Sequence, residues 1–230
     1  MRAILLAGGY GTRLRPLTLD VPKCLVQIKG RPLLEYWIEL LLVNGFDEII
    51  VNTHWLADRV NEFVRASKWS DRICLVHEPV LLGTGGTIRS NTCIYDSEDV
   101  FVAHADNLVR FDLSAFILKH RQRPPYCVMS LLSFRTDSPQ KCGILELNSD
   151  AAVINFHEKV ENPPGNIANG AVYILTPAII DYIHQFNSGI LDFSLDVIPN
   201  FIGRILAVET DGYHRDIGSL ESLAQAELEF

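Results

Sequence analysis

The chain has 230 residues, of which 48% are hydrophobic and 21% charged, a composition typical of a globular enzyme with a sizeable core. Its net charge of −8 provides no basic face for duplex nucleic acid, and no apolar run approaches the roughly 20 residues that a membrane helix needs. The 5 cysteines are odd in number and form no Cys-x-x-Cys pair, so neither a disulfide framework nor a zinc site is expected.

The apolar run at 3–7 ends in glycines, as a buried parallel strand does. It is too short for the apolar core of a signal peptide and lacks a small-residue cleavage site, so we expect a cytoplasmic protein. Pro32 favours the start of a helix and Asn44 its end, and apolar residues recur at helical spacing between them.

Strand-like and helix-like segments then alternate as far as residue 120. Further strands are expected at 49–52, 73–76 and 100–103, and further helices at 55–66 and 113–120. This alternation predicts an α/β fold with a Rossmann-like, mostly parallel sheet flanked by helices. Ligands bind at the carboxyl ends of such strands, where the glycines after residue 7, Glu78 and Asp106 all fall.

The second half of the chain is richer in strands and predicts a smaller, β-rich lobe. Strands are expected at 126–133, 143–147, 153–156, 171–175 and 205–208, helices at 177–186 and 219–229, and a loop at 161–166. We expect a single domain over 1–230, with a nucleotide-binding part at about 1–110 and a second part at about 111–230.

A glycine-rich loop directly after the first strand is the strongest local signal. Gly8, Gly9 and Gly11 allow the backbone to approach a ligand and to turn N–H groups towards phosphate oxygens. The loop lacks the Gly-Lys-Ser/Thr of a P-loop, and Leu14 stands where a dinucleotide fingerprint starting at Gly9 needs its last glycine. A phosphate-binding loop of another kind is therefore predicted.

The stretch from Gly8 to Lys23, GGYGTRLRPLT followed by VPK, resembles the signature of the sugar-1-phosphate nucleotidylyltransferases, or NDP-sugar pyrophosphorylases. The resemblance implies a nucleotide-diphospho-sugar transferase fold and transfer of a nucleotidyl group from an NTP to a sugar 1-phosphate, with Mg²⁺ as cofactor. Arg13 and Lys23 would neutralise the triphosphate and the leaving pyrophosphate, because fixed cations stabilise developing phosphoryl charge. The nucleotide-binding residues it implies are Leu6, Ala7, Gly8, Gly9, Gly11, Thr12, Arg13, Lys23, Glu78, Gly83, Thr84 and Gly85.

Gly83, Thr84 and Gly85 resemble the family's second glycine loop, which lies against the base and ribose. Glu78 stands where relatives carry a residue that reads the base, and its carboxylate would accept two hydrogen bonds from guanine. The alternative for Glu78 is a strand-end carboxylate that faces water.

Asp106 and Asp216 resemble the family's two metal ligands, and Mg²⁺ is commonly held by one or two carboxylates plus phosphate oxygens. Ala105 replaces the glycine that usually precedes the first aspartate. The resemblance therefore implies a catalytic set of Arg13, Lys23, Asp106, Lys159 and Asp216.

Two further motifs imply a sugar-binding region. Phe-His-Glu-Lys at 156–159 is similar to the family's Phe-x-Glu-Lys, although Val160 replaces the usual proline, and Asn169 begins an element in which Ala171 replaces a glycine. The sugar-phosphate-binding residues implied are Asn107, Gly143, Glu158, Lys159 and Asn169.

The overall pattern is similar to short guanylyltransferases for mannose-type or heptose 1-phosphates. UTP with an amino-sugar 1-phosphate is nearly as good a match, and a non-catalytic subunit that binds nucleotide sugars or a CDP-alcohol synthase are further alternatives. The expected partners are the NTP and the sugar 1-phosphate, without nucleic acid or membrane, and homo-oligomer formation is left open. The resemblance leaves no room in these 230 residues for the C-terminal β-helix of some relatives.

Overall fold

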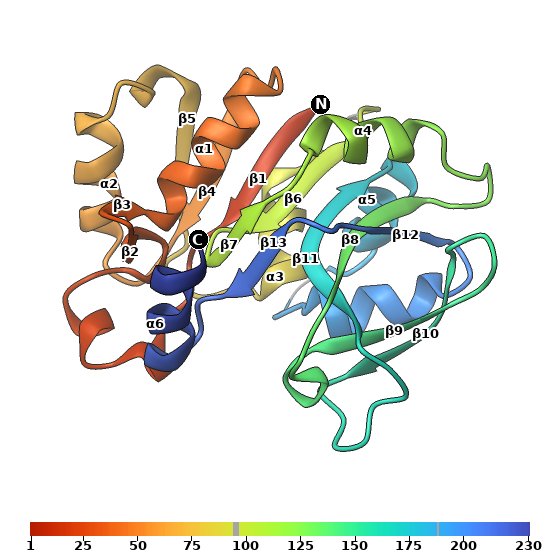
Figure 1. Ribbon diagram of the computed structural model, residues 1–230. Coiled ribbons are helices and arrows are strands. Elements are labelled where there is room, and N and C mark those ends of the chain that lie inside the picture. The colour runs from red at the N-terminus through yellow and green to blue at the C-terminus, as the bar shows by residue number, and fades with distance from the viewer. Residues whose placement is uncertain (94–96, 188) are drawn as a thin grey trace. The chain divides into compact units, whose positions relative to one another are not determined.

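The computed structural model describes residues 1–93, 97–187 and 189–230 (Figure 1). The chain divides into two compact units, of which the first comprises Met1–Leu81, Ala103–Arg110 and Gly212–Phe230. The second unit comprises Leu82–Val102 and Phe111–Asp211. Strand β6 (Val100–His104) is shared between the units, and the first unit is assembled from segments that are distant in sequence.

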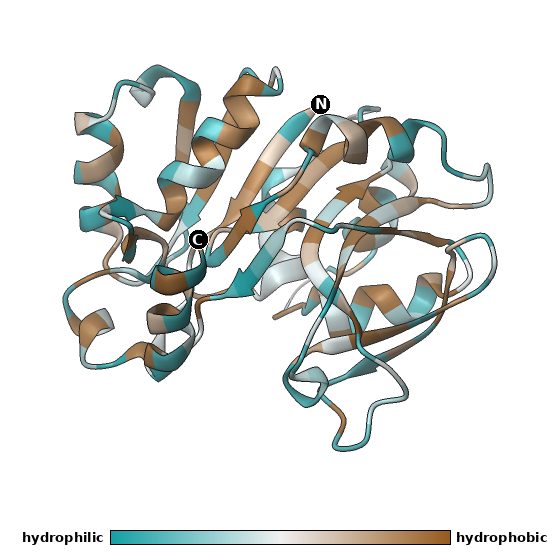
Figure 2. Ribbon diagram, viewed as in Figure 1, coloured by the Kyte–Doolittle hydropathy of each residue, from teal (hydrophilic) through white to brown (hydrophobic). Residues whose placement is uncertain are grey.

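Parallel strands form the centre of the first unit. Strand β1 (Arg2–Leu6) pairs in parallel with β4 (Ile49–Thr53), and β4 pairs in parallel with β5 (Ile73–His77). The apolar side chains of β1 and β4 are largely buried, whereas those of β5 are partly exposed, and Figure 2 shows β1 in brown over most of its length after the polar Arg2. The predicted strands at 3–7, 49–52 and 73–76 are therefore confirmed to within a residue or so at each end.

Helices α1 (Leu33–Val43) and α2 (Ala57–Ala66) accompany these strands and confirm the two predicted helices. Trp37 of α1 is fully buried, and its indole N–H donates a hydrogen bond of 2.8 Å to the carbonyl of Asn107. That bond ties α1 to the strand that follows Asp106, so the helix supports the candidate site directly.

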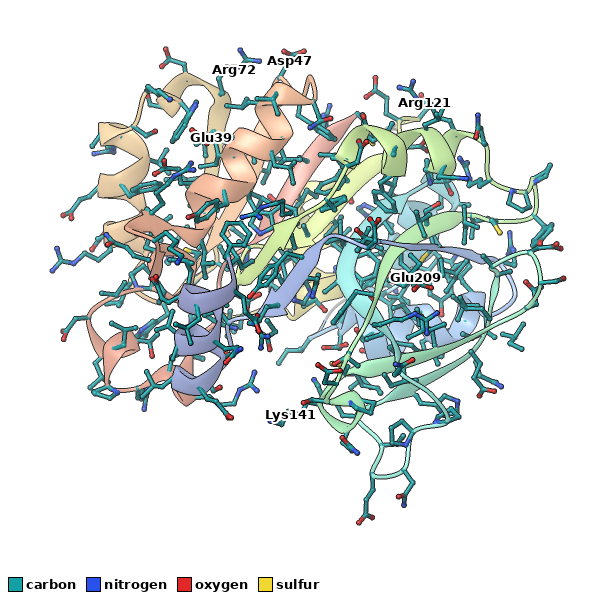
Figure 3. All side chains as sticks on the ribbon, in the orientation of Figure 1. Glu39, Asp47, Arg72, Arg121, Lys141 and Glu209 are labelled. Atoms are coloured by element: carbon teal, nitrogen blue, oxygen red, sulfur yellow. The ribbon has the colours of Figure 1, made fainter. Side chains whose placement is uncertain are left out.

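An ion pair on the surface of the first unit joins Arg72, just before β5, to Asp47, just before β4, with 2.7 Å between the guanidinium and the carboxylate (Figure 3). Asp47 is almost fully exposed, so this pair contributes at most about 1 kcal/mol to the free energy of unfolding.

A second pair of strands in the first unit was not predicted. Strand β7 (Asn107–Arg110) pairs in antiparallel fashion with β13 (Tyr213–Asp216), with Asn107 opposite Asp216 (Figure 1). Helix α6 (Leu220–Glu229) follows, and Ser219 caps its first turn with a capping box. The teal colour of β13 in Figure 2 reflects its sequence Tyr-His-Arg-Asp, which has no apolar alternation for sequence analysis to detect.

The second unit contains a largely antiparallel sheet. Strand β11 (Ile167–Leu175) pairs antiparallel with β8 (Met129–Arg135) and β9 (Gly143–Leu147), and β9 pairs antiparallel with β10 (Val153–Glu158). Strand β12 (Ile205–Glu209) runs parallel to β8. All five strands were predicted, although β8 starts three residues later than expected (129 − 126 = 3) and β11 starts four earlier (171 − 167 = 4).

Helices α4 (Leu113–Arg121) and α5 (Pro177–His184) confirm two predicted helices of the second unit. Helix α3 (Thr84–Asn91) lies where a glycine loop was expected. The helix was not predicted because Thr-Gly-Gly-Thr has low intrinsic helix propensity. No helix in the described part of the chain has both the length and the apolar character needed to cross a membrane.

Candidate active site

The two units divide the predicted site residues between them. The first unit holds Leu6, Ala7, Gly8, Gly9, Gly11, Thr12, Arg13, Lys23, Glu78, Asp106, Asn107 and Asp216. The second unit holds Gly83, Thr84, Gly85, Gly143, Glu158, Lys159 and Asn169.

The start of the first glycine loop is fixed by two hydrogen bonds. The N–H of Ala7 donates a buried hydrogen bond of 2.6 Å to the side-chain oxygen of Asn52, and Leu6 accepts one of 3.0 Å from the N–H of Ala105. A Cβ on Gly8 would lie 2.9 Å from the Asn52 amide nitrogen, so a side chain here would force the Asn52 amide that holds Ala7 to move. Gly9 has no atom within 4 Å of such a Cβ and therefore faces open space.

Gly11 has the left-handed backbone conformation, with φ of 62°. Its carbonyl accepts a hydrogen bond of 2.7 Å from the Thr18 hydroxyl, and a Cβ on it would lie 3.3 Å from Cβ of Lys23. The loop therefore packs against the base of the Lys23 side chain. The short 3₁₀ helix that starts at Thr12 then carries Arg13 outward, where 72% of its side chain is exposed.

Lys23, Asp106 and Asp216 meet at one point in the first unit. The Lys23 ammonium donates to Oδ2 of Asp106 at 2.5 Å and to Oδ1 of Asp216 at 3.1 Å. The second oxygen of Asp216 lies 3.6 Å from the Arg13 guanidinium. Four residues of the predicted catalytic set are thus linked in one chain of contacts, from Arg13 through Asp216 and Lys23 to Asp106.

The pairing of β7 with β13 explains how two aspartates so far apart in sequence become neighbours. Asp106 is in the turn between β6 and β7, Asp216 ends β13, and Asn107 lies opposite Asp216 in the register. The N–H of Ile217 also donates to the carbonyl of Asp106 at 3.2 Å. Ala105 is fully buried and does not have a positive φ, so the backbone here accepts alanine in place of the usual glycine.

Opposite charges in this cluster stabilise the ionised forms of Lys23 and Asp106. Burial opposes the charge on Lys23, but the attraction of Asp106 and Asp216 and its hydrogen bonds to both raise the pKa of Lys23 above its ordinary value. Burial likewise works against ionised Asp106, yet the attraction of Lys23 and then of His104 leaves the pKa of Asp106 below its usual range. Near neutral pH the site therefore holds a lysine cation between two carboxylates.

Asp106 and Asp216 fit a divalent cation, because both already direct an oxygen at one positive charge. Within the described residues no three His, Cys, Asp or Glu side chains group as a metal site. A hard cation here would have two protein carboxylates and would take its other ligands from phosphate and water, which suits Mg²⁺.

Glu78 lies near the glycine loop and is only 3% exposed, so the alternative of a strand-end carboxylate facing water is wrong. Nδ1 of His54 donates to the carbonyl of Glu78 at 2.7 Å, and its Nε2 then accepts from the Tyr10 hydroxyl at 2.9 Å. Sequence analysis did not assign His54 or Tyr10 to the site, although Tyr10 is inside the glycine motif.

The second glycine loop is closed against a nearby segment of its own unit. The N–H groups of Gly85 and Gly86 both donate to the carbonyl of Leu191, and a Cβ on Gly83 would lie 2.5 Å from the same oxygen. The hydroxyl of Thr84 accepts from the N–H of Phe193 at 2.8 Å. Close packing alone therefore requires these glycines, whatever they contribute to nucleotide binding.

Gly143, Glu158 and Lys159 form one group in the second unit. Glu158 pairs with Gly143 across β10 and β9, and a Cβ on Gly143 would lie 2.6 Å from Oε2 of Glu158. The Lys159 ammonium is 3.0 Å from Oε1 of Glu158, and 65% of the lysine side chain is exposed. Glycine at 143 thus allows the carboxylate to lie over the neighbouring strand beside an accessible cation.

Asn169 lies on β11 and holds a local irregularity of that strand. Its Nδ2 donates to the buried Tyr173 hydroxyl at 2.8 Å, and its Oδ1 accepts from the N–H of Ala171 at 3.0 Å. Ala171 has a φ of 52°, in the left-handed region that favours glycine. This conformation explains why the family pattern has glycine where this chain has alanine.

The family model for nucleotidyl transferases matches residues 2–230. The chain belongs to that family. The family resemblance read from the glycine, arginine and lysine motif is therefore confirmed.

Several named relatives of this nucleotidyl transferase are similar over most of its length. The "Mannose-1-phosphate guanylyltransferase catalytic subunit beta" of Xenopus tropicalis is 29% identical over 225 residues, which cover 95% of this chain and 61% of the relative. The Danio rerio protein of the same name is 30% identical over 223 residues, again covering 95% of this chain and 61% of the relative. This nucleotidyl transferase thus spans about three fifths of the length of these curated relatives.

A solved structure supports the predicted fold class. HddC from Yersinia pseudotuberculosis, complexed with GMP-PN, superposes with a TM-score of 0.82 at 28% identity, covering 100% of this chain and 99% of that one. The expectation of an α/β fold with a mostly parallel sheet flanked by helices, of nucleotide-diphospho-sugar transferase type, is confirmed for this nucleotidyl transferase. The boundaries expected for its two parts stay a prediction.

Proposed function

We propose that this nucleotidyl transferase transfers a guanylyl group from GTP to a mannose-type or heptose 1-phosphate and releases pyrophosphate. The contact of Lys23 and Arg13 with the carboxylates of Asp106 and Asp216 is the observation that supports this proposal most. Cations next to paired carboxylates suit a reaction in which a metal–triphosphate complex is held and pyrophosphate leaves. The guanylyltransferase names of the relatives favour GTP over UTP.

In the proposed reaction, an oxygen of the sugar 1-phosphate attacks the α-phosphorus of the NTP in line with the leaving pyrophosphate. The attacking oxygen is already anionic, so no side chain is needed as a general base. The open backbone at Gly9 leaves room for the triphosphate, while the Arg13 guanidinium and the Lys23 ammonium neutralise its oxygens.

Mg²⁺ held by Asp106 and Asp216 would screen the negative charge shared by the phosphates. In the second unit, we assign the sugar hydroxyls to Glu158 and Asn169 and the sugar phosphate to the exposed Lys159. A cation that meets the incoming phosphate lowers the repulsion between two anionic reactants, and positioning of this kind supplies much of the catalysis of phosphoryl transfer.

We assign recognition of the base to Glu78. Its buried carboxylate suits the paired N–H donors of guanine, whereas uracil presents carbonyl acceptors beside its single ring N–H. Gly83, Thr84 and Gly85 are assigned to the base and ribose, as the family resemblance implies.

Two alternatives remain for the whole protein. A uridylyltransferase for an amino-sugar 1-phosphate would use the same cations and carboxylates with a different base contact. A non-catalytic subunit would not need Lys23, Asp106 and Asp216 to meet, so their contact favours an enzyme. A cytoplasmic location stays a prediction, and homo-oligomer formation stays open.

The decisive experiment is a pyrophosphate-release screen with Mg²⁺ that crosses five NTPs with hexose, amino-sugar and heptose 1-phosphates. Release with GTP and a mannose-type or heptose 1-phosphate is expected. Release only with UTP would overturn the base assignment. If no pair in the panel releases pyrophosphate, but calorimetry shows that nucleotide sugars still bind, the non-catalytic alternative is favoured.

A further inference from the structure

The Lys23 ammonium lies at the point on which the carboxylates of Asp106 and Asp216 both converge. Only 10% of the Lys23 side chain is exposed, and its two contacts of 2.5 and 3.1 Å use one oxygen from each aspartate. Lys23 therefore already supplies these two carboxylates with a counter-ion. A divalent cation held through the same two oxygens would compete with the Lys23 ammonium for them.

We propose that Lys23 acts as an exchangeable counter-ion: it neutralises Asp106 and Asp216 in the free protein and gives them up when a metal–nucleotide complex arrives. This proposal rests on the proposed function, because it takes the two aspartates as the metal ligands. It adds that metal binding and nucleotide binding favour each other, because the ammonium displaced by the metal needs a phosphate as its new partner.

A divalent cation bound by those two oxygens would compete with the Lys23 ammonium for the same position. A Mg²⁺ ion lies about 2.0–2.1 Å from each ligand oxygen, so an ammonium at hydrogen-bond distance from the same oxygens would be only a few ångströms from it. Two like charges at such a separation repel strongly in a partly buried site. A divalent cation alone must therefore displace Lys23 without offering its ammonium another anion.

The backbone around Lys23 supplies a nearby destination for the ammonium. A Cβ on Gly11 would lie 3.3 Å from Cβ of Lys23, so the glycine loop runs directly beside this side chain. Lysine has a flexible stem of four carbons, and a phosphate on the N–H groups of that loop would be within reach of its ammonium. Arg13 is different, because it touches only the outer oxygen of Asp216, at 3.6 Å, and does not lie between the carboxylates.

The test measures Mn²⁺ binding by calorimetry to the protein without nucleotide. Lys23→Met removes the counter-ion, and its Mn²⁺ affinity is expected to exceed that of the wild type by tenfold or more. Lys23→Arg keeps a cation between the carboxylates and should stay within threefold of the wild type. Arg59→Met removes an exposed cation on helix α2 that pairs with Glu62, and as the control it should also stay within threefold.

An unchanged or weaker Mn²⁺ affinity in Lys23→Met would overturn the exchange. The double variant Lys23→Met, Asp106→Asn must lose the added affinity, which shows that the ion binds at these carboxylates. Lys23→Gln is measured in parallel, with far-UV circular dichroism of every variant, so that a folding defect in one variant leaves the comparison intact.

These measurements use no substrate, so their outcome is distinguishable from that of the pyrophosphate-release screen. Tighter Mn²⁺ binding in Lys23→Met, together with no pyrophosphate release by the wild type in the screen, would support the counter-ion role of Lys23 and reject the proposed function. The reverse pattern would keep the enzyme and make Lys23 a fixed structural contact.

Discussion

The ammonium of Lys23 lies 3.1 Å from Oδ1 of Asp216, a residue 193 positions further along the chain. The same ammonium contacts Asp106, which follows Lys23 by 83 positions. Three distant segments thus supply one charged cluster, and the same three segments make up the first unit. Single substitutions in this cluster are therefore expected to have distinct, measurable effects.

Replacing either aspartate by asparagine should lower turnover strongly while leaving the fold intact. Asp106→Asn and Asp216→Asn each remove one carboxylate charge from the proposed metal and phosphate site, and we expect pyrophosphate release to fall by about 10²–10³-fold. Asp150→Asn, at an exposed position in the second unit, is the matched control and should keep wild-type turnover. Near-normal turnover in Asp106→Asn would contradict the assignment of the metal ligands.

Substitution of Glu78 should lower the preference of the protein for one nucleobase over another. Hydrogen bonds to a charged group contribute about 1.5–3 kcal/mol, so Glu78→Gln is expected to reduce the preference for GTP over UTP by about 10–100-fold. The ratio of kcat/KM for the two nucleotides measures this effect. Glu48→Gln, on the exposed surface of the same unit, should leave the ratio unchanged.

Gly9 and Gly11 offer a matched pair within one loop. Gly11→Ala forces a left-handed alanine whose Cβ would lie 2.9 Å from Cγ2 of Thr18, and it should lower the free energy of unfolding by at least about 1–2 kcal/mol. Gly9→Ala meets no protein atom, so its stability should stay within about 0.5 kcal/mol of the wild type.

The same Gly9→Ala variant should nevertheless bind NTP more weakly, because its methyl group occupies the space assigned to the triphosphate. Urea denaturation and nucleotide calorimetry on both variants separate the two effects. Equal nucleotide affinity in Gly9→Ala and wild type would remove the open backbone at this position from the binding site.

Ala171→Gly should stabilise the protein. Its φ of 52° costs an alanine about 1 kcal/mol that glycine does not incur, although part of the gain is offset by the greater freedom of glycine in the unfolded chain. A higher midpoint of urea denaturation is the expected result. Ala168→Gly, on the same strand but buried and without a positive φ, should lower the midpoint instead.

Asp99 makes part of the stability of the second unit depend on pH. Its hydrogen bond with Nε2 of the buried His120, at 3.1 Å, holds the pKa of Asp99 below its ordinary value. A depressed pKa in the folded state means that the contribution is complete above the unfolded value of about 3.9 and is lost as the pH falls through the folded pKa. Wild type should therefore exceed Asp99→Asn in denaturation midpoint at pH 6.

That advantage should shrink steadily as the pH is lowered from about 4 to 2, and denaturant titrations at several pH values measure it. A difference between the two proteins that does not change over this range would rule out the ionised carboxylate as its source.

Hydrophobic periodicity was enough to predict the strands and helices that pack the two units. Strand β1 and helix α1 have the apolar runs and spacing that the core needs, so their positions follow from the sequence. Strand β13 does not, because it is formed by Tyr-His-Arg-Asp and depends on its partner β7. Helix α3 was missed because packing against Leu191 offsets the poor helix propensity of its glycines.

Some residues of the candidate site could likewise be predicted from the sequence, and others could not. Arg13 and Lys23 are found from the spacing of one motif, because phosphate chemistry needs cations close to a glycine loop. The contact between Asp106 and Asp216 cannot be read locally, since it depends on the register in which Asn107 faces Asp216. Backbone conformation is equally hidden, as the positive φ of Ala171 and the tie from Tyr10 through His54 to Glu78 illustrate.

The register of β7 with β13 also orders events during synthesis. A ribosome releases Lys23 and Asp106 long before Tyr213–Asp216 emerges, so a nascent chain has the lysine and one carboxylate of the cluster before it has the second carboxylate. The contact joins segments far apart in sequence, and contacts of that kind form late in folding. The cluster therefore reports on folding itself: a chain that has assembled it has already brought residues 213–216 into place.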